Sequence, residues 1–212
     1  MNNFTEFAVD NWDVLMNALS QHAYISFVSV LIGSAVAVPA AIFLTRRPRI
    51  ADPVMAAAGI VQTIPSLVLL GLAMPVFGIG FKTGLIVLVI YSILPVLRNT
   101  YTGIKEIDGK YIEAAKGMGM NSMQRLFSVE IPVAMPLIIT GVRMSTVYII
   151  SWATLAALIG AGGLGDLIFT GLQTYNYNMI LLGALPACIL ALVSSGLIGL
   201  LQKAVTPRGL RK

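Results

Sequence analysis

The sequence is short of charge. Asp, Glu, Lys and Arg together make up 11% of the 212 residues, whereas a soluble domain carries about 25% because its surface faces water. Apolar residues make up 57% of the chain, and the mean hydropathy is +0.86. This scarcity of charge argues against a water-soluble domain. It predicts that most side chains face lipid or other buried helices.

Cysteine and histidine are also scarce, with one residue of each. Cys188 has no partner for a disulfide within the chain, and a cysteine-based metal site is not expected. His22 stands beside the first apolar run, where an interfacial position is expected rather than a ligand role. The net charge is +5, but basic residues are not clustered with aromatics as in phosphate-backbone binders. We therefore expect no nucleic acid, no metal and no cofactor on this chain.

The N-terminus lacks the basic residues of a cleavable signal peptide. Residues 1–21 contain three acidic side chains and no Lys or Arg. Their apolar residues fall roughly at helical spacing. We therefore predict that residues 1–23 form an amphipathic helix on the outer membrane surface.

Long apolar segments dominate the rest of the chain. A helix needs about 20 mostly apolar residues to cross the hydrocarbon core. Prolines lie in or beside most of the segments, which favours packed, kinked helices of a transporter over a simple membrane anchor. The prediction is an all-α, multi-pass membrane protein with about five spans, namely 24–44, 53–77, 81–97, 136–159 and 179–202.

The basic residues are distributed unevenly between the two sides that five spans define. The regions after spans one, three and five hold 3, 5 and 4 of the 14 basic residues. Because basic residues are retained on the cytoplasmic side, the N-terminus is predicted outside and the C-terminus in the cytoplasm. The residues concerned are Arg46, Arg47, Arg49, Arg98, Lys105, Lys110, Lys116, Arg125, Lys203, Arg208, Arg211 and Lys212.

The segment 99–132 is the one sizeable loop that this orientation places in the cytoplasm. Residues 111–116 favour a helix, Gly117 and Gly119 interrupt it, and residues 122–129 resume it. Several of its side chains, including Met118 and Phe127, are apolar although the loop faces water. Exposed apolar surface on a short loop predicts a docking site for a partner.

The loop carries a spaced motif: Glu113-Ala114-Ala115, then Gly119, then Val129-Glu130-Ile131-Pro132. It resembles the EAA loop of permease subunits of binding-protein-dependent ABC importers. The resemblance implies a type I importer transmembrane domain over residues 1–212, with 99–132 as the coupling loop on the ATPase. Glu113 would pair with a basic residue opposite, Ala114 and Ala115 would allow close approach, and Gly119 would permit a sharp turn. Without the motif, Glu113 would be a solvated carboxylate paired with Lys110 or Lys116.

The resemblance also implies partners. The chain has no Walker A pattern, so ATP and Mg²⁺ belong to a separate ATPase, and the chain itself is a transport subunit and not an enzyme. Two ATPase subunits, a second permease (an identical copy or a paralogue) and an extracytoplasmic substrate-binding protein are expected. The location implied is the bacterial cytoplasmic (inner) membrane.

Other stretches narrow the family. Residues 159–166 resemble the small five-span permeases for methionine, sulfonates and quaternary amines. Residues 62–66, 94–104, 151–155 and 165–171, with the tail 206–209, resemble the osmoprotectant subgroup of the OpuB/OpuC type, which imports glycine betaine, carnitine or choline. A methionine- or sulfonate-type permease remains an alternative. An ion-coupled secondary transporter is less favoured, because none of the nine acidic residues lies within a span.

Candidate pathway and docking residues follow from the expected cargo. A quaternary ammonium ion is recognised by aromatic faces, so Tyr91, Tyr148 and Trp152 are candidates to line a pathway, with ordinary packing as the alternative. Arg143, the one charged residue within the fourth segment, is functional or extends its side chain to the cytoplasmic headgroups.

Three further residues are candidates to contact the binding protein. They are Asp166, Tyr175 and Tyr177.

Overall fold

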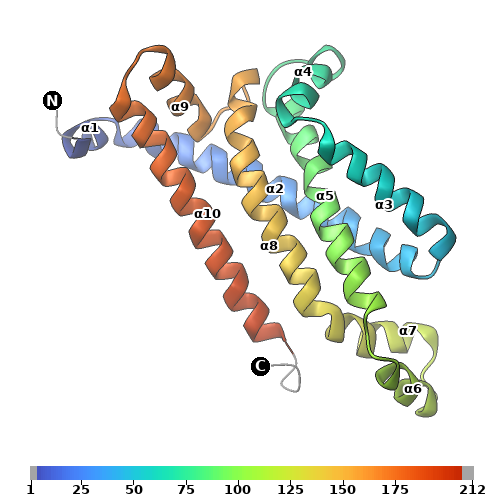
Figure 1. Cartoon of the computed structure of the whole chain (residues 1–212). Coiled ribbons are helices and arrows are strands. Elements are labelled where there is room, and N and C mark those ends of the chain that lie inside the picture. Colours follow the sequence, from blue (N-terminus) through green and yellow to red (C-terminus); the bar gives the residue numbers. More distant parts are fainter. Residues whose placement is uncertain (1–3, 207–212) are drawn as a thin grey trace.

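A computed structural model describes residues 4–206, which form helices and turns without a strand (Figure 1). The all-α prediction is therefore confirmed. The helices are α1 Phe4–Asp10, α2 Trp12–Thr45, α3 Pro48–Thr63, α4 Ser66–Phe77, α5 Phe81–Lys105, α6 Gly109–Gly117, α7 Ser122–Arg125, a π-helical turn Leu126–Glu130, α8 Ile131–Ala156, a 3-10 turn Ala157–Ile159, α9 Leu164–Gln173 and α10 Tyr177–Val205.

Among the described residues, four helical stretches are long and apolar enough to cross a membrane. They are α2, α5, the continuous stretch Ser122–Ile159 that contains α8, and α10. The pair α3 and α4 meets the same criteria together but is bent by 95° at its break. The bend lies at Ile64, which is extended (ψ 126°) because the residue before a proline avoids the helical conformation. The five predicted segments thus correspond to four unbroken helices and one broken pair.

The first membrane-spanning helix begins earlier in the chain than predicted. Residues 12–23, expected in a separate surface helix, belong to α2, and only α1 stands apart. The apolar side of this region packs inward, with Leu15 and Ala18 against Leu164 and Leu182. Helical spacing of apolar residues does not distinguish a helix lying on lipid from one packed on a neighbouring helix. The predicted segment 1–23 is therefore corrected to α1 and the N-terminal part of α2.

His22 is the second correction. It was expected at the membrane interface, but it is fully buried in α2. Its ring Nε2 lies 3.0 Å from the main-chain oxygen of Ile150 in α8. The imidazole thus joins two spans inside the bundle.

The helix α5 lies at the centre of the bundle, packed against α2 on one side and α8 on the other, and α10 packs on α8 and α9. In Figure 1 the α2–α3 turn, α6, α7 and the end of α10 lie toward one end of the bundle, whereas α1, α4 and α9 lie toward the other. Most basic residues of the described range therefore gather at the end that carries α6, whereas Lys82 lies at the start of α5 toward the other end. This grouping agrees with the positive-inside argument, and the orientation itself stays a prediction. Arg208, Arg211 and Lys212 lie outside the described residues.

Small residues bring the central helices close together. The hydroxyl of Ser92 in α5 lies 3.1 Å from the oxygen of Ser29 in α2, and Ser145 in α8 donates to the oxygen of Ser92 at 2.9 Å. At Gly141 in α8, an added Cβ would lie 2.9 Å from the oxygen of Pro95. In lipid, close packing and interhelical hydrogen bonds replace the hydrophobic effect as the force between helices. The centre of the bundle therefore depends on the absence of a side chain at Gly141.

Replacing Gly141 with Val is expected to destabilise the α5–α8 contact, because the new Cβ overlaps backbone that cannot move aside. The cost expected for such overpacking is about 1–3 kcal/mol, measured as a lower melting temperature of the detergent-solubilised protein. Gly196→Val is the matched control, since an added Cβ there meets nothing within 4 Å. Equal melting temperatures for the two variants would contradict the packing described here.

The candidate coupling site

Side chains and a glycine define both ends of α6. Asp108 precedes the helix, and its carboxylate accepts a hydrogen bond from the Lys110 amide at 3.0 Å and pairs with Lys110 Nζ at 2.7 Å. The hydrogen bond from the Lys110 side chain is the main reason why the pKa of Asp108 is below its ordinary value. At the other end, Gly119 has a φ of +75°. Its amide donates to Lys116 and the next amide donates to Ala115, which is the Schellman pattern of hydrogen bonds.

The sharp turn that the sequence predicted at Gly119 is therefore present. A left-handed φ strains any residue with a Cβ, so the glycine is required by the backbone although the space around it is open.

The two faces of α6 differ. Ala115 was expected, with Ala114, to allow close approach of the ATPase, but it is 1% exposed because it packs toward the rest of the chain. Glu113 and Ala114 are exposed. Lys110, which an isolated loop would offer to Glu113, pairs with Asp108 instead. Within residues 4–206, Glu113 forms no ion pair. The face of Glu113 and Ala114 is therefore unoccupied by the described part of the chain.

The second helix of the loop continues into a span. Asn121 and Gln124 form a reciprocal capping box, each side chain accepting from the other residue's amide at 2.9 Å. From there the chain runs through α7 and the π-helical turn into α8 without a break. The Ile131 amide donates to Leu126, five residues earlier, and Pro132, the next residue, has no amide proton to donate. The two predicted helices are present, but the second is the first part of one rod with α8.

Glu130 is a site residue that sequence reasoning missed. Its side chain is 3% exposed and lies in the π-helical turn. One carboxylate oxygen accepts from Arg46 Nη2 at 2.5 Å, and the other accepts from Arg125 Nε at 2.9 Å. Arg46 comes directly after α2, so its ion pair with Glu130 joins the end of α2 to the π-helical turn. The sequence shows only an acidic residue two positions before Pro132, and nothing in it indicates which basic residues are near.

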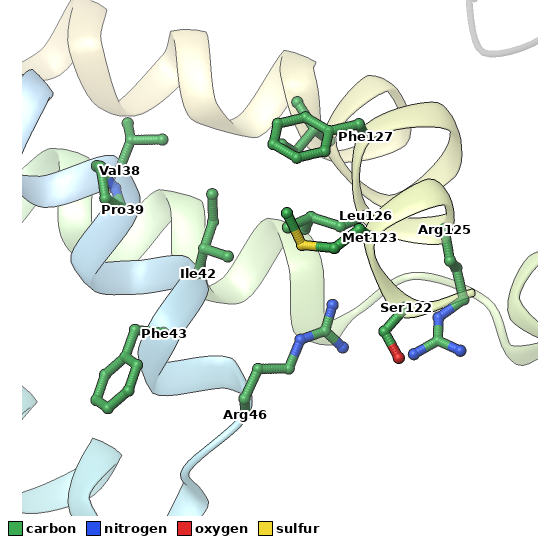
Figure 2. A pocket seen from close by; sticks show the side chains of 11 residues that line it. Val38, Pro39, Ile42, Phe43, Arg46, Ser122, Met123, Arg125, Leu126 and Phe127 are labelled. Carbon is green, nitrogen blue, oxygen red and sulfur yellow. The ribbon is translucent and has the colours of Figure 1, made fainter. Parts of the chain in front are cut away.

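A cavity of about 820 Å³ lies between α2 and the segment formed by α7 and the π-helical turn (Figure 2). Figure 2 shows Ile42 and Phe43 on one wall and Met123 and Phe127 on the other. Met123 and Phe127 are about 60% exposed (62% and 61%), as the predicted apolar surface of the loop requires. The full lining is Val38, Pro39, Ile42, Phe43, Arg46, Ser122, Met123, Arg125, Leu126, Phe127 and Ile131.

The candidate pathway aromatics meet in one group. The ring centroid of Trp152 lies 4.7 Å from that of Tyr91 and 5.7 Å from that of Tyr148. Tyr91 is buried, and its hydroxyl donates at 2.6 Å to the oxygen of Ile64 at the α3–α4 break. Tyr148 is 41% exposed. Arg143 is bound to a different helix: its Nε donates to the hydroxyl of Ser195 in α10 at 2.7 Å.

The candidate contacts for a binding protein lie at the end of the bundle away from α6 (Figure 1). Asp166 is in the first turn of α9, and partial desolvation raises the pKa of its carboxyl group. Tyr175 and Tyr177 are 86% and 78% exposed at the turn into α10. The three side chains therefore reach the surface, and their role stays a prediction.

Residues 29–210 match the sequence model of the family described as binding-protein-dependent transport system inner membrane component. This chain belongs to that family. The permease is thus an inner-membrane transport component, and membership implies partner subunits, a substrate-binding protein among them.

Relatives match over nearly their whole length. The carnitine transport permease protein OpuCB of Listeria monocytogenes is 44% identical over 212 residues, covering 100% of this chain and 97% of the relative. The glycine betaine/carnitine/choline permease protein OpuCB of Bacillus subtilis is 44% identical over 211 residues, with the same coverage. Among solved structures, an inward-facing MetNI methionine ABC transporter has a TM-score of 0.85 at 22% identity, covering 93% of this chain and 99% of the other. That likeness establishes the fold alone.

Replacing Asn121 with Ala is expected to loosen α7, because it removes one side of the capping box. Loss of such a cap costs about 1 kcal/mol, which corresponds to roughly fivefold faster exchange of the capped amides. Hydrogen–deuterium exchange of residues 121–126 in the detergent-solubilised permease measures this. Ser122→Ala, one residue along, is the control and should leave exchange unchanged; equal exchange in the two variants would argue against the cap.

Proposed function

We propose that this permease is the membrane subunit of an ATP-driven importer for quaternary-ammonium compatible solutes, namely glycine betaine, carnitine or choline. The observation that carries this proposal is the 44% identity over the full chain to permeases named for these solutes. The permease of the methionine transporter shares the fold at only 22% identity. The osmoprotectant assignment is therefore favoured over the methionine-type alternative.

The exposed face of α6 is the proposed ATPase contact. Glu113 forms no ion pair in the described chain and Ala114 is small, so a partner groove can approach the helix closely and place a basic residue on the carboxylate. In this arrangement the α6 end faces the cytoplasm, where ATP is available. ATP is bound and hydrolysed by two partner ATPases, and a second permease, identical or paralogous, completes the membrane part.

The other end of the bundle faces the binding protein in this proposal. Asp166, Tyr175 and Tyr177 supply an exposed charge and two exposed rings there. Within the membrane, Tyr148 and Trp152 offer aromatic faces for a passing ammonium group. Tyr91 supports these rings and holds the α3–α4 break through its hydroxyl. Because Arg143 is bonded to α10, it contributes a positive charge at the α8–α10 seam rather than to the aromatic group.

Glu113→Lys is expected to abolish co-purification of the ATPase, because it places a positive charge opposite the basic residue that receives Glu113. Glu106→Lys is the matched control: Glu106 is an exposed carboxylate at the end of α5, seven residues away. Tagged permease is captured from membranes and the associated ATPase activity is measured. Retention of the ATPase by Glu113→Lys, or its loss with Glu106→Lys, would contradict the proposed contact.

Uptake by cells lacking this subunit tests the cargo. At high osmolarity, in a strain without redundant importers, such cells should lose uptake of at least one of labelled glycine betaine, carnitine and choline, and keep methionine uptake. A plasmid copy of the permease should restore the lost uptake. Lost methionine uptake with normal uptake of all three amines would favour the methionine-type alternative instead.

A further inference from the structure

The carboxylate of Glu130 is buried where the loop meets the membrane-spanning bundle. Burying an unpaired carboxylate costs several kcal/mol, and pairing with hydrogen-bond donors offsets that cost. Here both oxygens are engaged, one by Arg46 and the other by Arg125. A charge held in this way keeps its neighbours in fixed positions, because separation from either arginine leaves one buried carboxylate oxygen without its donor.

The two arginines come from different places. Arg125 lies five residues before Glu130 on the same continuous helical stretch, so that pair is local. Arg46 lies 84 residues away and caps the C-terminal end of α2. The pair with Arg46 therefore connects the coupling loop to a different span.

A cavity separates the two segments that the Arg46–Glu130 pair connects. Between α2 and the segment of α7 and the π-helical turn lies an open space of about 820 Å³, with Arg46 and Arg125 in its lining (Figure 2). Apolar walls that face each other across a gap do not transmit displacement. A charge-assisted hydrogen bond resists both separation and misalignment. The Arg46–Glu130 pair thus spans a groove that side-chain packing leaves open.

We propose that Arg46 and Glu130 are positioning residues that pass movement of the coupling loop to α2, in addition to its direct continuation into α8. The path extends further, because α3 begins at Pro48, two residues after Arg46, and leads into the α3–α4 break. The loop would then move α8, α2 and the broken pair together. This inference rests on the proposed ATP-driven function.

The primary test is Arg46→Gln, because Glu130 keeps Arg125 as a partner and the protein can still fold. Arg47→Gln is the matched control, since Arg47 is exposed and forms no ion pair within residues 4–206. Permease, ATPase and binding protein are reconstituted in liposomes, with labelled glycine betaine as the probe. Uptake per ATP hydrolysed should fall about tenfold in Arg46→Gln, a size typical of lost coupling, while ATPase association and ATP hydrolysis persist. Arg46→Lys should restore part of it, and Arg47→Gln should match wild type.

A distance measurement tests the same link without any cargo. Spin labels replace Phe43 on α2 and Met123 on α7, which belong to opposite walls of the cavity, in a background with Cys188→Ser. In the otherwise unaltered protein the label distance should stay constant between nucleotide-free and ATP-trapped complexes, because α2 follows the loop. In Arg46→Gln it should change with nucleotide. A constant distance in Arg46→Gln, or an unchanged ratio of uptake to hydrolysis, overturns the inference.

The two experiments separate failure of this inference from failure of the proposed function. If the wild-type complex hydrolyses ATP but takes up no glycine betaine, carnitine or choline, the cargo assignment is wrong, and the label distances still decide whether α2 follows the loop. If uptake is normal in both wild type and Arg46→Gln, the importer assignment stands and the link is refuted.

Discussion

In lipid, every backbone amide and carbonyl must find its partner within the protein, and much of this structure results from that requirement. The span formed by α3 and α4 is broken at Ile64, whose carbonyl lies outside both helices. The hydroxyl of Tyr91, from the neighbouring α5, donates to this carbonyl. Near the opposite end, Gln202 of α10 donates to the oxygen of Pro136 in α8. The break at Ile64 is therefore matched by a polar side chain of the neighbouring helix, and the Gln202 bond joins α10 to α8.

The same need for partners applies to the buried carboxylate of Glu130, which therefore shows which segments are held together. A carboxylate that is only 3% exposed requires nearby cations to offset its lost hydration. Its two partners, Arg46 and Arg125, belong to different segments of the chain. The π-helical turn places Glu130 in this position, since a π-helical turn contains one residue more than an α-helical turn and rotates the later residues around the helix axis. Such irregular turns occur frequently at functional sites, and here the turn lies between the motif and the span.

Fold and cargo have different sources of support. The bundle is shared with a methionine transporter at 22% identity, so the arrangement of helices does not select the solute. Under the proposed function, selection would depend on local side chains, such as the rings of Tyr148 and Trp152, and on the binding protein that delivers the solute. The cargo proposal consequently rests on identity to named relatives over the full chain.

The sequence by itself determined the class, the number of apolar segments and the turn at Gly119, because these depend on composition, local hydropathy and the φ angle of one glycine. The motif also indicated the exposed positions Glu113 and Ala114 of α6, but it did not distinguish them from Ala115, which packs toward the rest of the chain. The sequence did not place the boundary of α2, the burial of His22 or the partners of Glu130. Those depend on which distant residues meet after folding, such as His22 and Ile150, which are 128 residues apart along the chain. Only the tertiary structure brings Arg46 to Glu130, because an ion pair across a groove has no signature in local spacing.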